Sequence, residues 1–103
     1  MKNTIHYSAL AEQDLDGIFA YIAYDLQNPI AAQNTIQGIM ATIADLKTLS
    51  GIGTKVILPN AIDSGYRFIS YKNYLAFYRQ EAQDIYIDRV LYNKRDYLSI
   101  LFG

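Results

Sequence analysis

Apolar residues recur in the first half of the chain with the spacing of an α-helix. Counted from Leu15, they fall three, four, seven and eleven residues further on, which places them on one stripe of a helix. The stripe consists of Leu15, Ile18, Phe19, Ile22 and Leu26. Ser8 is a favourable N-cap before it, and Glu12 lies near the first turn. The pattern predicts a helix from Ser8 to about Leu26 or Gln27.

A second helical pattern follows almost at once. Asn28 and Pro29 form a good N-cap and first-turn pair, because proline lacks only an N–H that would have no partner there. The second stripe is Ala32, Ile36, Ile39, Ile43 and Leu46. Gly51 and Gly53 predict that this helix ends after Leu49. Because about two residues join the helices, they must fold back as an antiparallel hairpin.

The remaining pattern predicts short strands. One opens the chain at Thr4 to Tyr7, and an irregular stretch runs from about Ser50 to Ser64. Three further strands follow at Tyr66 to Tyr71, Leu75 to Gln80, and Ile85 to Tyr92. Their short polar connections favour an antiparallel meander.

The expected fold is therefore a single α+β domain over residues 1–103, with the order β-α-α-β-β-β. The helical hairpin should pack on one face of a four-stranded, mainly antiparallel sheet and leave the opposite face open to a ligand or partner. Asp96 to Phe102 should form a short C-terminal helix or an apolar tail. A chain of 103 residues with 51% hydrophobic content supports one core and one domain.

Composition excludes several classes of function. The chain has no cysteine and one histidine, His6, which excludes disulfides, thiol chemistry and the usual zinc sites. We expect no metal and no cofactor. There is no apolar run that would span a membrane and no secretion signal, so we expect a cytoplasmic protein without a membrane partner.

Charge divides the chain into two unlike halves. Residues 1–46 hold one lysine against five acids, a net −4, whereas residues 47–103 hold eight lysines and arginines against five acids, a net +3. The second half therefore has the charge to form a basic face toward phosphate, although scattered surface charge explains it equally well. Ten tyrosines suit a surface that a partner covers, because the ring buries apolar area while the hydroxyl stays wet.

The order of these elements and of particular residues resembles the RelE/ParE superfamily of toxins from type II toxin–antitoxin systems. In the hairpin the resemblance lies in Tyr7-Ser8, Ala11, Asp14-Leu15, Ile18, Tyr21-Ile22, Asn28-Pro29 and Ala31-Ala32. In the strands and the closing motif it lies in Tyr66-Arg67, residues 73–79, residues 89–92 and residues 95–97. It covers almost the whole chain, and its specificity comes from the ordered set of motifs.

The resemblance implies a toxin that arrests growth and a cognate antitoxin that neutralises it. Operator DNA would be bound only through the antitoxin. ParE-like members are associated with poisoning DNA gyrase, whereas RelE-like members cleave mRNA on the ribosome. If this chain is an enzyme, the resemblance implies a metal-independent endoribonuclease.

A ribonuclease without a metal needs a base, a cation and an acid around the scissile phosphate. The resemblance assigns these catalytic roles to Arg67, Arg95 and Tyr97. The set is incomplete, because Leu75 stands where an arginine is expected and no histidine lies near Arg95. Structural ion pairing is the competing interpretation for both arginines.

Other residues are candidates for contacts with a target or a partner. Arg79, Lys94 and Tyr92 are candidates for nucleic-acid or target binding, and Leu98, Leu101 and Phe102 are candidates for partner binding. Packing onto the chain's own core competes with these roles. Arg89 is expected to form a partly buried ion pair.

The incomplete nuclease set and the long hairpin favour the ParE-like branch, with DNA gyrase or replication as the target. One alternative is a RelE-like mRNA interferase. A second alternative is an inactive toxin fold that serves as an antitoxin-binding or operon-regulating module.

Overall fold

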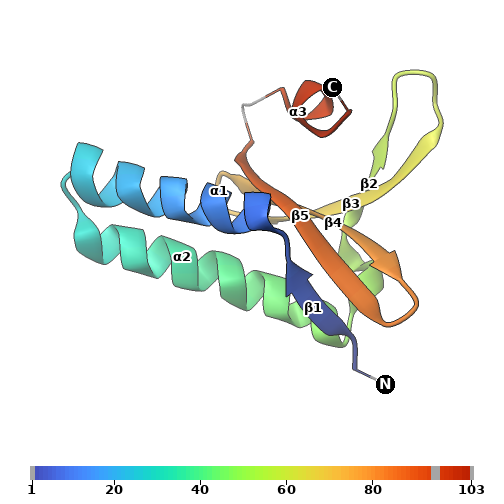
Figure 1. Cartoon of the computed structure of the whole chain (residues 1–103), viewed down its shortest axis with the longest axis horizontal. Coiled ribbons are helices and arrows are strands. Elements are labelled where there is room, and N and C mark those ends of the chain that lie inside the picture. The colour runs from blue at the N-terminus through green and yellow to red at the C-terminus, as the bar shows by residue number, and fades with distance from the viewer. Residues whose placement is uncertain (1, 94–95, 103) are drawn as a thin grey trace.

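A five-stranded mixed sheet forms the centre of the molecule (Figure 1). The computed structural model describes residues 2–93 and 96–102. The strands are β1 (Thr4–Tyr7), β2 (Thr54–Ile57), β3 (Asp63–Tyr71), β4 (Tyr74–Glu81) and β5 (Asp84–Tyr92), in the spatial order β1-β5-β4-β3-β2. β1 runs parallel to β5, and all other neighbours are antiparallel.

The two long helices form the antiparallel hairpin that the sequence predicts. α1 (Ala9–Ala20) continues into a π-helical turn (Tyr21–Asp25), and α2 (Pro29–Ala44) runs back beside it (Figure 1). Both predicted N-caps are confirmed, since the Ser8 Oγ accepts a hydrogen bond from the Ala11 N–H at 3.0 Å and the Asn28 Oδ1 accepts one from the Ala31 N–H at 3.1 Å. The far end of the hairpin extends beyond the sheet.

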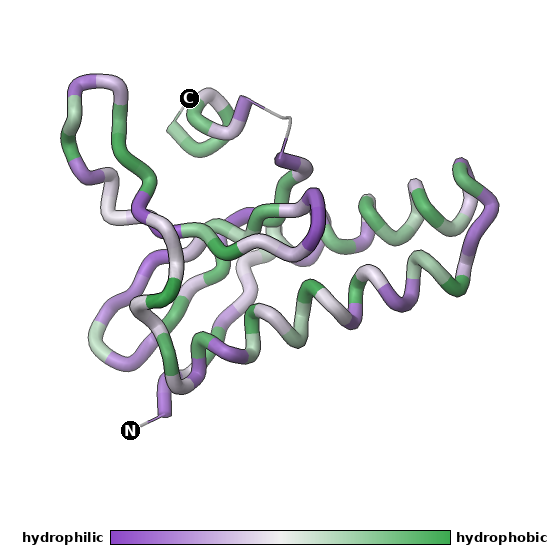
Figure 2. The backbone as a smooth tube through the Cα atoms, turned by 180° about the vertical axis from the view of Figure 1, so that it is seen from behind, coloured by the Kyte–Doolittle hydropathy of each residue, from purple (hydrophilic) through white to green (hydrophobic). Residues whose placement is uncertain are grey.

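The main core lies between the hairpin and one face of the sheet. Polar and apolar residues alternate along both helices (Figure 2), and their apolar stripes meet apolar residues of β3, β4 and β5. The buried members of this core are Ala11, Leu15, Ile39, Ile43, Leu46, Ile69, Ala76, Tyr78, Ile85, Ile87 and Val90. No helix among the described residues is long and apolar enough to cross a membrane.

The opposite face of the sheet is partly covered, which corrects the expectation of an open face. α3 (Tyr97–Phe102) lies over it, and its side chains pack on a second cluster. The buried members of that cluster are Val56, Leu75, Phe77 and Leu91. The closing segment covers these groups because they would otherwise expose a large apolar patch.

Two further expectations need correction. The stretch from Ser50 to Ser64 contains β2, and β3 begins at Asp63, so the sheet has five strands rather than four. β2 has four residues and buries only Val56, which is too little alternation for a sequence pattern to detect. In addition, α2 ends at Ala44, and two short 3-10 turns (Asp45–Lys47 and Ser50–Ile52) replace its expected last turn.

Two helical glycines lie in contrasting surroundings and predict opposite results for the same substitution. At Gly38 in α2 an added Cβ would overlap the ring of Tyr71, whereas at Gly17 in α1 it would meet no atom of the described residues within 4 Å. We expect Gly38→Ala to lower the free energy of unfolding by about 2 kcal/mol. We expect Gly17→Ala to raise it by about 0.5–1 kcal/mol, because alanine is the better helix former. Urea unfolding of both variants checks this, and two effects of the same sign would contradict it.

Candidate functional site

Four side chains form a row across the sheet on the face that carries α3. His6 of β1 pairs with Tyr86 of β5, which pairs with Arg79 of β4, and the β3–β4 register places Tyr66 beside Arg79. Paired residues on neighbouring strands share a face of the sheet. We call His6, Tyr86, Arg79 and Tyr66 the polar row.

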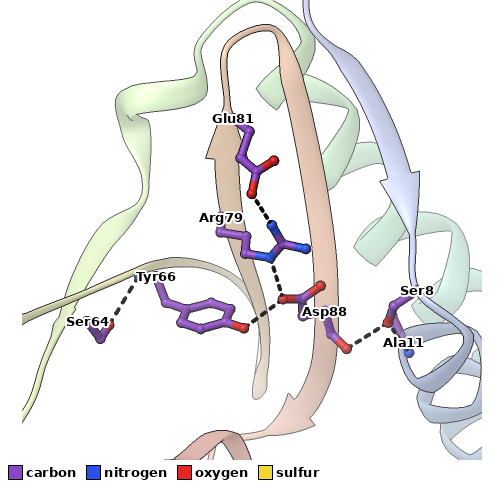
Figure 3. A network of polar contacts seen from close by, with 7 residues as sticks. All are labelled: Ser8, Ala11, Ser64, Tyr66, Arg79, Glu81 and Asp88. Atoms are coloured by element: carbon purple, nitrogen blue, oxygen red, sulfur yellow. Dashed lines mark hydrogen bonds and ion pairs between the residues drawn. The ribbon is translucent and has the colours of Figure 1, made fainter.

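Aromatic stacking and hydrogen bonds hold the polar row together. The Arg79 guanidinium carbon lies 4.5 Å from the Tyr86 ring centroid, and the His6 ring stacks on the same ring at 5.1 Å. Arg79 donates from Nε to Asp88 at 3.1 Å and from a terminal nitrogen to Glu81 at 2.8 Å (Figure 3). The Tyr66 hydroxyl donates to the same Asp88 oxygen at 2.7 Å.

The cation of the polar row, Arg79, lies among carboxylates. Asp88 and Glu81 neutralise Arg79, and Asp84 lies 2.9 Å from Nε2 of His6. Burial and the hydrogen bond to Asp88 raise the pKa of Tyr66, which keeps its hydroxyl protonated as a donor. Burial alone would lower the pKa of Arg79, but the carboxylates outweigh it and raise that pKa. The row therefore presents a paired cation in acidic surroundings, which suits phosphate poorly.

Arg67 lies on the face of the sheet that the hairpin covers, and it binds the loop before β2. It pairs in register with Tyr78, which belongs to the main core, and donates to the Gly53 carbonyl at 2.8 Å. The Tyr78 hydroxyl donates to the Ser50 carbonyl at 2.7 Å and accepts from the Gly53 N–H at 3.1 Å. Burial raises the pKa of Tyr78. Both side chains fix the loop before β2.

The structure does not bring Arg67 and Tyr97 together. Tyr97 packs on Phe77 with ring centroids 5.1 Å apart, in the cluster under α3. Because Phe77 and Tyr78 point to opposite faces of β4, the sheet separates Tyr97 from Arg67. Arg95 and Lys94, the other predicted site residues of this region, lie outside the described residues.

The predicted partner-binding residues all lie in α3. Leu98 and Leu101 are half-buried against the second cluster, which is the packing onto the chain's own sheet that the sequence left open. Phe102 is 43% exposed and meets Tyr66 edge-on, with centroids 5.7 Å apart. Of these three residues, Phe102 offers the most surface to a partner.

A groove lies between α1 and the ends of β4 and β5. It has a volume of about 800 Å³, and its lining includes Gly17, Tyr21, Tyr74 and Tyr92. Tyr92 stands edge-on to Tyr74, with centroids 5.7 Å apart. Tyr92 was predicted as a target contact, whereas Gly17, Tyr21 and Tyr74 were missed. The sequence offers one signal for them, a glycine inside the predicted first helix.

The expected ion pair of Arg89 also lines this groove. Arg89 donates two hydrogen bonds of 2.8 Å to Asp14 of α1, one from Nε to Oδ2 and one from a terminal nitrogen to Oδ1. Oδ2 of Asp14 also accepts a hydrogen bond from the Val90 N–H at 3.0 Å. The hydrogen bond to Asp14 raises the pKa of Arg89. This bidentate ion pair joins α1 to β5 beside the groove.

Solved structures with a similar fold come from toxin–antitoxin systems. One, the chromosomal ParDE system from P. aeruginosa, has 22% identity and a TM-score of 0.72, covering 88% of this chain and 96% of that chain. The RelBE2 toxin–antitoxin complex from Mycobacterium tuberculosis has 16% identity and a TM-score of 0.65, covering 89% and 92%. The E. coli DinJ-YafQ complex has 16% identity and a TM-score of 0.52, covering both chains fully.

At these identities the solved structures establish the fold alone. No curated protein is similar enough to this chain to count as a match. A family model does match, over residues 5–97, and it describes the ParE toxin of the type II toxin–antitoxin system parDE. The match includes the hairpin, β2 to β5, all of β1 except Thr4, and the first residue of α3. The chain therefore belongs to the ParE family of type II toxins.

Proposed function

We propose that this toxin arrests growth in the cytoplasm by binding DNA gyrase rather than by cutting RNA. The observation that carries the proposal is that each described arginine is already engaged within the chain. Arg79 binds two carboxylates, Arg89 binds Asp14, and Arg67 binds backbone carbonyls. A metal-free ribonuclease needs a cation that is free to stabilise the phosphorane.

The geometry of the assigned nuclease set supports the same proposal. Arg67 and Tyr97 lie on opposite faces of the sheet, so no single phosphate can contact both. The match to the ParE family agrees with a target other than mRNA, because the resemblance to ParE-like toxins implies DNA gyrase. Inhibition by binding needs a complementary surface and no catalytic group.

We further propose that a cognate antitoxin neutralises the chain. The solved toxin–antitoxin complexes with this fold support a protein partner of that kind. An antitoxin segment that orders on binding would add to an edge of the sheet or cover exposed apolar groups, Phe102 among them.

The proposal predicts whether DNA synthesis or protein synthesis stops first when the chain is expressed without its antitoxin. We expect the rate of DNA synthesis to fall before the rate of protein synthesis. Uptake of labelled precursors measures both rates. Arg95→Ala and Tyr97→Phe should arrest growth as fast as the unmodified chain, because neither side chain is needed to bind gyrase.

Two other outcomes of this experiment would contradict the proposal. Immediate loss of protein synthesis with cleaved transcripts, relieved by Arg95→Ala, would establish the mRNA interferase. Normal growth while soluble folded chain accumulates would establish the inactive binding module.

A further inference from the structure

The groove beside α1 is suited to a peptide rather than to a charged small molecule. Among the described residues that line it, only Asp14 and Arg89 are charged, and they satisfy one another through two hydrogen bonds. The rest of the lining is largely apolar or phenolic and includes Ile18, Tyr21 and Leu26. Such a surface buries apolar side chains and offers hydroxyls to a polypeptide backbone.

Gly17 indicates that another backbone approaches α1 closely. It is exposed in the helix interior, where glycine costs about 1 kcal/mol relative to alanine. Packing within the described part of this chain does not require glycine here, since an added Cβ would meet no described atom within 4 Å. Gly17 lines the groove between Gln13 and Tyr21, which share its row of the helix, so a partner that enters the groove would use the space.

The charge beside the groove indicates what the occupant carries. Residues 9–44 contain four acids and no lysine, arginine or histidine. Asp14 is neutralised by Arg89, but Glu12, Asp16 and Asp25 enter no ion pair within the described part of the chain. Each of these three immediately precedes a groove residue, namely Gln13, Gly17 and Leu26. An occupant with lysine or arginine beside its apolar contact is therefore favoured.

We propose that the groove binds a segment of the target enzyme in which a large apolar side chain is flanked by basic residues. This inference rests on the proposed function. An enzyme that holds DNA carries lysine and arginine along its DNA path, and the acidic edge of α1 complements that surface. The apolar side chain enters between Tyr21 and Tyr92, while the backbone passes over Gly17.

The test measures inhibition of supercoiling by the purified DNA gyrase holoenzyme. Gly17→Leu fills the groove without removing a contact, and Asp16→Lys reverses the charge at its edge. We expect each substitution to raise the half-inhibitory concentration about tenfold, the change that 1.4 kcal/mol of binding energy produces. The matched controls are Ala41→Leu on the exposed side of α2 and Asp45→Lys after its end, and both should inhibit as the unmodified chain does.

The possible outcomes separate this inference from the proposed function. If the unmodified chain does not inhibit gyrase, the proposed function fails, and the inference fails with it. If the unmodified chain inhibits and Gly17→Leu inhibits equally well, the groove is not the contact and only the inference fails. Loss of antitoxin binding in Gly17→Leu with inhibition retained would assign the groove to the antitoxin and overturn the inference. Thermal unfolding confirms that each variant is folded.

Discussion

Phe77→Ala is expected to lower the free energy of unfolding by about 4 kcal/mol. The Phe77 side chain is 0% exposed and lies at the centre of the cluster under α3. Its ring centroid is 5.1 Å from that of Tyr97 and 5.8 Å from that of Phe68. Removing the ring leaves a cavity and takes away the surface on which α3 rests. Urea unfolding followed by circular dichroism measures the loss.

The matched control is Phe77→Leu, which keeps most of the apolar volume and should cost about 1 kcal/mol. Because the six residues of α3 are held by this cluster, hydrogen exchange in Tyr97–Phe102 should accelerate more in Phe77→Ala than exchange in α2. An alanine variant as stable as the leucine variant would show that α3 contributes little to the fold.

Arg89→Met is expected to lower the free energy of unfolding by about 3 kcal/mol. The Arg89 and Asp14 side chains are only 21% and 14% exposed, so the substitution leaves a carboxylate in a site largely shielded from water. Asp14 would keep the hydrogen bond from the Val90 N–H but lose both hydrogen bonds from the guanidinium group. Urea unfolding at neutral pH measures the effect.

Two further variants distinguish a buried pair from a surface pair. The double variant Asp14→Leu/Arg89→Leu should be more stable than Arg89→Met, because it leaves no unpaired charge. Arg79→Met should cost about 1 kcal/mol, because Arg79 and Glu81 are 39% and 68% exposed and water screens their attraction. Asp88 is 22% exposed but keeps the hydrogen bond from the Tyr66 hydroxyl. Equal losses in Arg79→Met and Arg89→Met would contradict the role assigned to burial.

Local sequence signals determined the helical hairpin and the three-stranded meander. Ser8 and Asn28 cap their helices within three residues of themselves, and the stripes through Leu15 and Ile39 turn inward as expected, except at Leu26, which is 56% exposed. These signals act over one or two helical turns, so a pattern in the sequence contains all that they require. The turn at Lys72 and Asn73 is equally local.

The bulge in β5 shows what local patterns miss. Tyr78 pairs with Ile87 and Phe77 pairs with Arg89, so Asp88 is an extra residue opposite the β4 strand. The sequence pattern assigns Leu91 to the same face as Ile85 and Ile87. The structure places Leu91 in the cluster under α3, whereas Ile85 and Ile87 lie in the main core. A one-residue shift in pairing reverses every face beyond it.

The sequence by itself determined the order of the main elements, the helix caps, the three-stranded meander and the resemblance to a toxin family, because each depends on residues close together in the chain or in a fixed order. Only the tertiary structure decided that Arg67 and Tyr97 lie on opposite faces and that Arg79 is neutralised by Asp88. It also joined Asp14 to Arg89, 75 residues apart, and formed the groove beside Gly17. These features depend on strand register and on which faces pack together, and no local pattern specifies either.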